Sequence, residues 1–292
     1  MGVREVSTVT LCAFSDEAGA PLATQIKCLL ENGIYRTELR SIDGVNVGDL
    51  SEDAARRAAR ELTDAGISVF SIGSPLGKSS LERPLEEQKK LLAHLLRLAD
   101  IFGTKRIRVF SYYAEPATYK AVEEEVIARL RALVAAAPGY RLALENDCGL
   151  FGATVENCLT IASRVSGLAR VYDPANFILS GEDIRRARET LAGGADYYHI
   201  KDAVKETGEI VPAGMGDCEI DTLISEIQGD ITLTVEPHLH VFDGYALIDQ
   251  KELRNRFTYA SQEESFRAAA DAVKGLLTKN GYMEMERGIW KK

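Results

Sequence analysis

The sequence predicts an α/β protein with a single domain, a (β/α)8 TIM barrel. Strand-type and helix-type segments alternate along most of the chain, and the connections between them are short. The strand-type segments recur about every 30 residues, which is the length of one βα unit. With 292 residues, the chain also has the size of such a barrel. We expect the barrel over residues 1–279 and a polar C-terminal tail or assembly arm over residues 280–292.

Eight segments have the composition of buried parallel strands. They are rich in Val, Ile, Tyr, Phe and Thr, and most are apolar enough to be covered on both faces. The expected strands are residues 8–14, 35–40, 67–73, 106–111, 141–145, 169–173, 196–201 and 231–236.

Helical patterns lie between these strands. Residues 86–103 repeat apolar side chains at helical spacing and stop at a glycine, and residues 121–139 end with Pro-Gly. A long loop at about 237–260 precedes the final helix, residues 261–277. A doubly wound sheet is the alternative fold, but the first β-turn-α segment has no G-x-G-x-x-G motif.

Composition excludes several classes of protein. A net charge of −9 disfavours nucleic acid as a partner, because neutralising phosphates requires a basic face. The sequence has neither a long apolar run for a membrane span nor an apolar, cleavable N-terminus. Val6 stands where a myristoylation signal requires Ser or Thr. Five scattered cysteines without C-x-x-C indicate reduced thiols, so we expect a cytoplasmic protein.

Four polar residues end consecutive strands in the second half of the chain: Glu145, Asp173, His199 and Glu236. In a barrel, the C-terminal ends of strands carry the chemistry, and these residues are each about one βα unit apart. A single carboxylate there more often caps a helix or pairs with an arginine, and a single histidine is more often a core residue. Four together favour a shared divalent ion, because unpaired charges at the ends of apolar strands are costly. Three oxygen donors and one nitrogen donor suit Mn²⁺, Mg²⁺, Co²⁺, Fe²⁺ or Zn²⁺.

These residues stand in motifs that resemble the xylose isomerase-like TIM barrels. The motifs are LEND, YDPAN, HIKDA with a downstream PAGMGD, and VEPHL, and the resemblance extends from FSDEA to the last helix. The group includes sugar phosphate isomerases/epimerases, ketose 3-epimerases, inosose isomerases and dehydratases, hydroxypyruvate isomerases and endonuclease IV. The resemblance implies that Glu145 and Glu236 are metal ligands and also the acid/base pair, and that Asp173 and His199 complete the ligand set.

The chain departs from some members of this group. Many epimerases have a histidine three residues after the aspartate, where this chain has Asn176. Many also have an arginine about six residues after the histidine ligand, where Lys205 is nearest. The trinuclear zinc centre of endonuclease IV requires many histidines, and this chain has four. These departures disfavour a ketose 3-epimerase and a DNA-repair enzyme.

The expected activity is a divalent-metal-dependent isomerisation or epimerisation of a sugar, keto-sugar or cyclitol. A carboxylate removes the proton next to the carbonyl and an enediolate forms, so that Glu145 and Glu236 act as base and acid. Two alternatives stay open. A lyase acting on a keto-inositol or 3-keto-glycoside begins with the same proton abstraction, and a non-catalytic sugar-binding or assembly subunit retains only the barrel. Phosphorylation of the substrate and assembly into a homo-oligomer also stay open.

Further polar residues near the strand ends are candidates for binding the substrate. Lys78 belongs to GSPLGK, which lacks the spacing of a P-loop, and Asp202 orients a ligand or caps a helix. His238 contacts the substrate or has a loop role only. The full set of expected substrate-binding residues is Glu38, Arg40, Ser74, Lys78, Asn176, Lys201, Asp202 and His238.

Overall fold

The computed structural model describes residues 7–240 and 257–292, so most of the loop expected at about 237–260 lies outside the described residues. Eight parallel strands form the central barrel. They are β1 (Thr8–Ala13), β2 (Arg36–Leu39), β5 (Ser68–Gly73), β6 (Arg106–Val109), β7 (Arg141–Glu145), β8 (Ala169–Tyr172), β9 (Tyr197–Ile200) and β12 (Asp230–Val235).

The barrel is closed by its first and last strands. Each of the eight strands pairs in parallel with the next one along the chain. β12 then pairs with β1 over the full length of both, from Thr8 opposite Asp230 to Ala13 opposite Val235. All eight expected strands are present within one or two residues of their expected bounds, and the (β/α)8 TIM barrel is confirmed.

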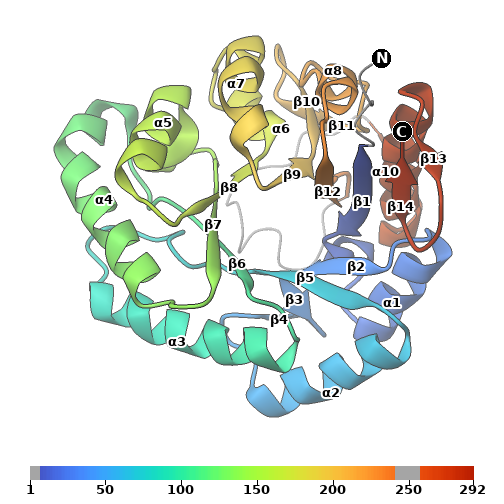
Figure 1. Cartoon of the computed structure of the whole chain (residues 1–292), viewed down its shortest axis with the longest axis horizontal. Helices are drawn as coiled ribbons and strands as arrows, with labels where there is room; N and C mark the ends of the chain where they lie inside the picture. The colour runs from blue at the N-terminus through green and yellow to red at the C-terminus, as the bar shows by residue number, and fades with distance from the viewer. Residues whose placement is uncertain (1–6, 241–256) are drawn as a thin grey trace, which may run out of the picture.

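Helices surround the strands, as Figure 1 shows. Several begin where the sequence supplies a capping side chain: Ser51, Thr154 and Asp183 each accept a backbone N–H of the helix that follows. The helices are α1 (Leu22–Glu31), α2 (Glu52–Asp64), α3 (Leu85–Ile101), α4 (Tyr119–Ala135), α5 (Val155–Arg164), α6 (Pro174–Leu179), α7 (Ile184–Leu191), α8 (Ile220–Ser225) and α10 (Gln262–Lys279). Their apolar faces and the outward faces of the strands form the main hydrophobic core. Among the described residues, no helix combines the length and apolarity needed to cross a membrane.

Two short hairpins and a 3-10 helix lie in the connections that follow strands. The hairpins are β3–β4 (Ser41–Ile42 with Val45–Asn46) and β10–β11 (Asp202–Val204 with Glu209–Val211). The 3-10 helix η1 (Ser15–Ala18) follows β1 directly.

The inward faces of the strands combine an apolar layer with a polar one. Side chains alternate along a strand, so Ala143 and Glu145 share one face of β7, and Tyr197 and His199 share one face of β9. Ala143 and Tyr197 belong to a small buried cluster that is separate from the main core. Glu145 and His199 are one step nearer to the C-terminal ends of the strands and are also buried. The polar layer therefore lies at the end of the barrel where chemistry is expected.

The segment after α10, expected to be a polar tail, is folded against the barrel. Its strands β13 (Met283–Glu284) and β14 (Ile289–Lys291) form a hairpin, and β14 pairs antiparallel with β1 (Figure 1). β2 pairs with β1 only near Ala13, which leaves the earlier part of that edge of β1 to β14. Trp290 is only 4% exposed, and so the apolar side chains of this polar-looking segment complete the core.

We expect Trp290→Ala to lower the free energy of unfolding by about 3 kcal/mol, because it removes a large buried aromatic side chain and leaves a cavity. Urea denaturation measures the change. Met283→Ala, at a position that is 69% exposed, serves as the control and should shift stability by no more than about 0.5 kcal/mol. Equal denaturation midpoints for both variants would contradict a structural role for the hairpin.

Candidate metal centre

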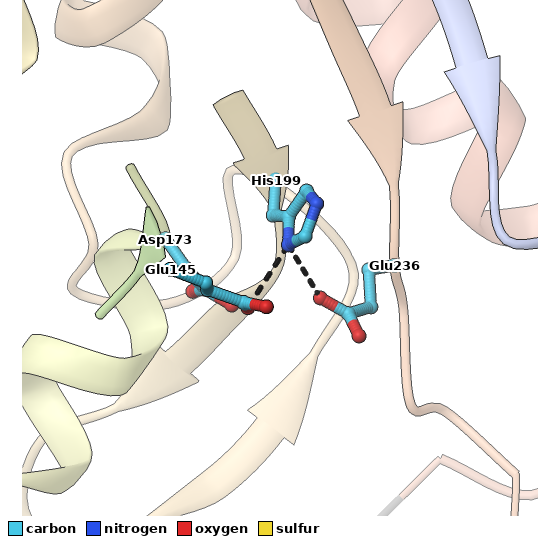
Figure 2. A group of neighbouring side chains, drawn as sticks. All are labelled: Glu145, Asp173, His199 and Glu236. Atoms are coloured by element: carbon cyan, nitrogen blue, oxygen red, sulfur yellow. Dashed lines mark hydrogen bonds and ion pairs between the residues drawn. The ribbon is translucent and has the colours of Figure 1, made fainter. Parts of the chain in front are cut away.

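The four strand-end residues converge at one point of the barrel mouth. Glu145 ends β7, Asp173 directly follows β8, His199 lies in β9 and Glu236 directly follows β12. Each contributes one ligand atom, and these four atoms all lie within 4.8 Å of one another. All four side chains are buried. Figure 2 shows them pointing toward a common centre.

The geometry at His199 fits a metal ion. Its Nδ1 atom lies 2.9 Å from Oε1 of Glu145 and 3.1 Å from Oε2 of Glu236 (Figure 2). Ligand atoms about 2.1 Å from an ion and at right angles to each other lie about 3 Å apart. Oε2 of Glu236 is buried and, apart from its ion pairs with His199 and Lys201, has no hydrogen-bond partner among the described residues. His199 and Lys201 compensate the charge of this buried oxygen in part, and a cation at this point would compensate it further.

Asp173 has two functions in the structure. Its Oδ1 atom caps α6 by accepting the backbone N–H groups of Ala175 and Asn176, at 2.9 and 3.2 Å. Its Oδ2 atom lies 2.8 Å from the ammonium group of Lys201. Burial raises the pKa of Asp173 to about 6, although Lys201 opposes the shift. Oδ1 therefore caps the helix while Oδ2 faces the centre, and the expected role of Asp173 as a metal ligand stays a prediction.

Glu38 lies behind the histidine. Its Oε2 atom is 3.1 Å from Nε2 of His199, and its Oε1 atom accepts the hydroxyl of Tyr197 at 3.0 Å. Such a partner fixes the ring orientation and leaves Nδ1 to face Glu145 and Glu236. Glu38 was expected to bind substrate; in the described structure its side chain is fully buried and contacts Nε2 of His199, on the far side of the ring from Glu145 and Glu236. The sequence places Glu38 near the end of β2, as the structure does, but it does not show how deep in the barrel the side chain lies.

Arg108 is a residue of the candidate site that the sequence reasoning missed. Its Nη1 atom donates to Oε2 of Glu145 at 3.0 Å, and its guanidinium stacks on the ring of Phe110 at 4.4 Å. Burial alone would raise the pKa of Glu145, but His199 and Arg108 outweigh it and hold the pKa below its ordinary value. The sequence did contain an indication of this role, since an arginine within a buried strand requires a nearby anion to compensate its charge.

Glu236 is held in the same way on the other side of the centre. Nη1 of Arg40 donates to its Oε1 atom at 3.2 Å, and Nε2 of His238 lies 3.5 Å from the same oxygen. Burial alone would raise the pKa of Glu236, but Lys201 and His199 lower it well below its ordinary value. The neighbouring cations therefore favour the ionised form of both expected acid/base carboxylates, and each turns one oxygen toward Nδ1 of His199.

The remaining expected substrate-binding residues lie at different distances from the centre. Asn176 and Lys201 border the centre: the Asn176 amide donates to Oδ2 of Asp173 at 3.1 Å, and Nζ of Lys201 lies 3.9 Å from Oε2 of Glu236. Lys78 is farther out and forms an ion pair of 2.7 Å with Asp147.

Ser74 and Asp202 have structural roles instead. The Ser74 hydroxyl donates to the backbone carbonyl of Arg108 at 2.6 Å and accepts the N–H of Leu76. The Asp202 carboxylate accepts the backbone N–H groups of Ala203, Gly214, Gly216 and Cys218 at 2.8 to 3.1 Å. A Cβ at Gly216 would lie 2.3 Å from Oδ1 of Asp202, which explains the glycine in PAGMGD. These polar groups organise loops in the described structure, and their contact with substrate stays a prediction.

The model of the xylose isomerase-like TIM barrel family matches residues 35–240. This chain belongs to that family. A comparison with curated protein sequences found no match.

Several solved structures share the fold of this xylose isomerase-like protein. An IOLI protein with a bound zinc atom aligns with a TM-score of 0.71 at 16% sequence identity, covering 94% of this chain and 100% of the other. D-psicose 3-epimerase, solved in the presence of D-fructose, aligns with 0.67 at 14% identity, covering 93% and 99%. The probable 3-DHS dehydratase AsbF of Bacillus anthracis aligns with 0.67 at 18% identity, covering 93% and 99%. At these identities the similarity extends to the fold alone.

We expect binding of a divalent ion to release about one proton from His199. Burial alone would lower the pKa of His199, but Glu145, Glu38 and Glu236 outweigh it and hold the pKa well above its ordinary value. The ion requires the neutral imidazole, so its apparent affinity should fall about tenfold per pH unit below that pKa. Calorimetric titration with Mn²⁺ or Zn²⁺ in buffers of different ionisation enthalpy measures the release. Identical heats in all buffers would contradict it.

We also expect Glu38→Gln to weaken metal binding about 10- to 100-fold, because the histidine loses a charged partner that orients it and raises its basicity. Competition against a fluorescent chelator measures the affinity. Glu31→Gln, at an exposed position on α1, is the matched control and should leave the affinity unchanged. If the two variants bind equally well, Glu38 has no part in the centre.

Proposed function

We propose that this protein is a divalent-metal-dependent isomerase or epimerase acting on a sugar, keto-sugar or cyclitol. The observation that carries the proposal is the convergence of ligand atoms from Glu145, Asp173, His199 and Glu236 within 4.8 Å of one another, all of them buried. The family and the neighbouring structures support it, since D-psicose 3-epimerase and a zinc-bound IOLI protein share the fold. Mn²⁺, Zn²⁺, Co²⁺ and Mg²⁺ all suit this donor set.

The two glutamates are proposed as the acid/base pair. Glu145 and Glu236 come from β7 and from the end of β12, and β8 and β9 lie between these strands in the barrel. The two carboxylates therefore approach a bound substrate from different sides. One removes the proton from the carbon next to the carbonyl, and the other returns a proton to the neighbouring carbon or to the opposite face. When bound, a divalent ion polarises the carbonyl and stabilises the negative charge that develops on its oxygen.

Lys201 and Asn176 are proposed to orient the substrate. The Lys201 ammonium lies between Asp173 and Glu236, at 2.8 and 3.9 Å, so a substrate oxygen beside the centre lies within its reach. The Asn176 amide occupies the position at which many epimerases have a histidine, and it donates to Asp173 and to the carbonyl of Asn146. An amide does not act as a general acid or base, so Asn176 is proposed to orient the substrate and not to transfer a proton.

A lyase is the second candidate, because the probable 3-DHS dehydratase AsbF is among the structural neighbours and elimination begins with the same proton abstraction. The test is incubation of the metal-loaded protein with keto-sugars and keto-inositols in D₂O, followed by NMR. Deuterium at the carbon next to the carbonyl without elimination supports the isomerase. Loss of a β-substituent supports the lyase, and no exchange with any substrate supports the non-catalytic alternative.

On a substrate that turns over, we expect Glu145→Gln and Glu236→Gln each to lower kcat by about 10²–10⁴-fold, because an amide cannot accept or return the proton. Lys78→Gln, at the outer ion pair with Asp147, is the comparison and should change KM more than kcat. Full turnover in both glutamate variants would show that the proton transfer occurs elsewhere.

A further inference from the structure

A second set of metal-type donors lies directly beside the first and shares one residue with it. Glu17, Glu236 and His238 each offer a ligand atom, and these atoms lie within 4.8 Å of one another. All three side chains are buried. Two carboxylates and an imidazole are a donor set suited to a divalent ion of the zinc or manganese type. The two oxygens of Glu236 would thus belong to different sites.

A cation of the protein itself already lies in this set. Nη1 of Arg40 is 3.2 Å from Oε1 of Glu236 and 3.4 Å from Nε2 of His238, and its Nη2 atom is 3.2 Å from Oε1 of Glu17. A guanidinium has five N–H donors and no acceptor. The contact with His238 is therefore a hydrogen bond when Nε2 carries the lone pair, which is also the form that binds a metal. The ligand atoms of Glu17, Glu236 and His238 therefore contact the guanidinium as they would contact a metal ion.

Arg40 is fixed in this place by the first strand and its 3-10 helix. Its Nε and Nη2 atoms donate to the two oxygens of Asp16 at 2.9 and 3.0 Å, which is a bidentate pair. The Ser41 hydroxyl donates to Asp16 as well, at 2.9 Å, and the ring of Phe14 lies 4.6 Å below the guanidinium. The Arg40 side chain is only 1% exposed.

We propose that Arg40 is a built-in substitute for a second metal ion, and that it restricts the centre to one exchangeable ion. The inference rests on the metal centre of the proposed function and adds its nuclearity. In the wild type, Arg40 engages Oε1 of Glu236 and leaves Oε2 for the single ion. Without Arg40, the donors of Glu17, Glu236 and His238 bind a second divalent ion, and Glu236 becomes a bridging ligand.

Arg108 provides the matched comparison within the same site. It is equally buried and donates to the other acid/base carboxylate, Glu145, at 3.0 Å. Its Nη2 atom, however, donates to the backbone carbonyl of Ser74, at 3.3 Å, and not to a second carboxylate among the described residues. In the described part of the chain, the only metal-type set that contains Glu145 is the first one. Removal of Arg108 therefore takes away a buried charge without uncovering a second set of donors.

The experiment measures how many ions each variant binds. Wild type, Arg40→Ala, Arg40→Lys, Arg108→Ala and the double variant Arg40→Ala/His238→Ala are dialysed against Mn²⁺, and bound metal is determined by elemental analysis. We expect about two ions per chain in Arg40→Ala and about one in all the others. Two Mn²⁺ ions about 3.5–4 Å apart couple magnetically, so Arg40→Ala alone should lose the six-line EPR spectrum of isolated Mn²⁺. If Arg40→Ala does not fold by circular dichroism, Arg40→Gln replaces it, with the same expectation.

The outcomes separate this inference from the proposed function. One ion in both the wild type and the folded Arg40→Ala variant, or two ions in the wild type, would overturn the role of Arg40 and leave the first metal site intact. A second ion that persists in the double variant would overturn the assignment of His238 as its ligand. No bound ion in any variant would overturn the metal centre itself, and with it the proposed function.

Discussion

Burial of many carboxylates in one small volume is the constraint on which the mouth of this barrel depends. Each ionised carboxylate loses its hydration there, and only nearby cations and hydrogen-bond donors compensate the loss. Two arginines, two lysines and His199 provide most of that compensation within the described structure, together with backbone N–H groups. The buried carboxylates in and around this region are Asp16, Glu17, Glu38, Glu145, Asp147, Asp173 and Glu236.

The arrangement of these cations also gives the site its direction. Arg108 binds the outer oxygen of Glu145 and Arg40 binds the outer oxygen of Glu236, so both inner oxygens converge on Nδ1 of His199. Glu38 holds the opposite nitrogen of the same ring. Donors that are fixed in this way before an ion or substrate arrives need little reorganisation on binding, which is the property of a preorganised site.

The sequence was sufficient for the fold and for the four converging residues, because both follow from periodicity along the chain. It was not sufficient for depth or for contacts between strands. In HIKDA, the side chains of His199 and Lys201 point to the same side of the chain and reach the centre. Asp202, the next residue, points the other way and accepts backbone N–H groups of a loop. Glu38 and Arg108 come from other strands, and only the closed barrel brings them to His199 and Glu145. Trp290 was missed because a two-strand hairpin finds its partner, β1, at the other end of the chain.

The first strand connects these two regions of the molecule. Along one edge its earlier residues pair with β14, and its end continues into η1, which carries Asp16 and Glu17. β12, which delivers Glu236, pairs with β1 along its whole length. The distance between Glu236 and the η1 carboxylates is thus set by backbone hydrogen bonds, and Arg40 bridges that distance with its guanidinium. The closed barrel thus fixes the gap between Glu17 and Glu236 that the guanidinium of Arg40 occupies.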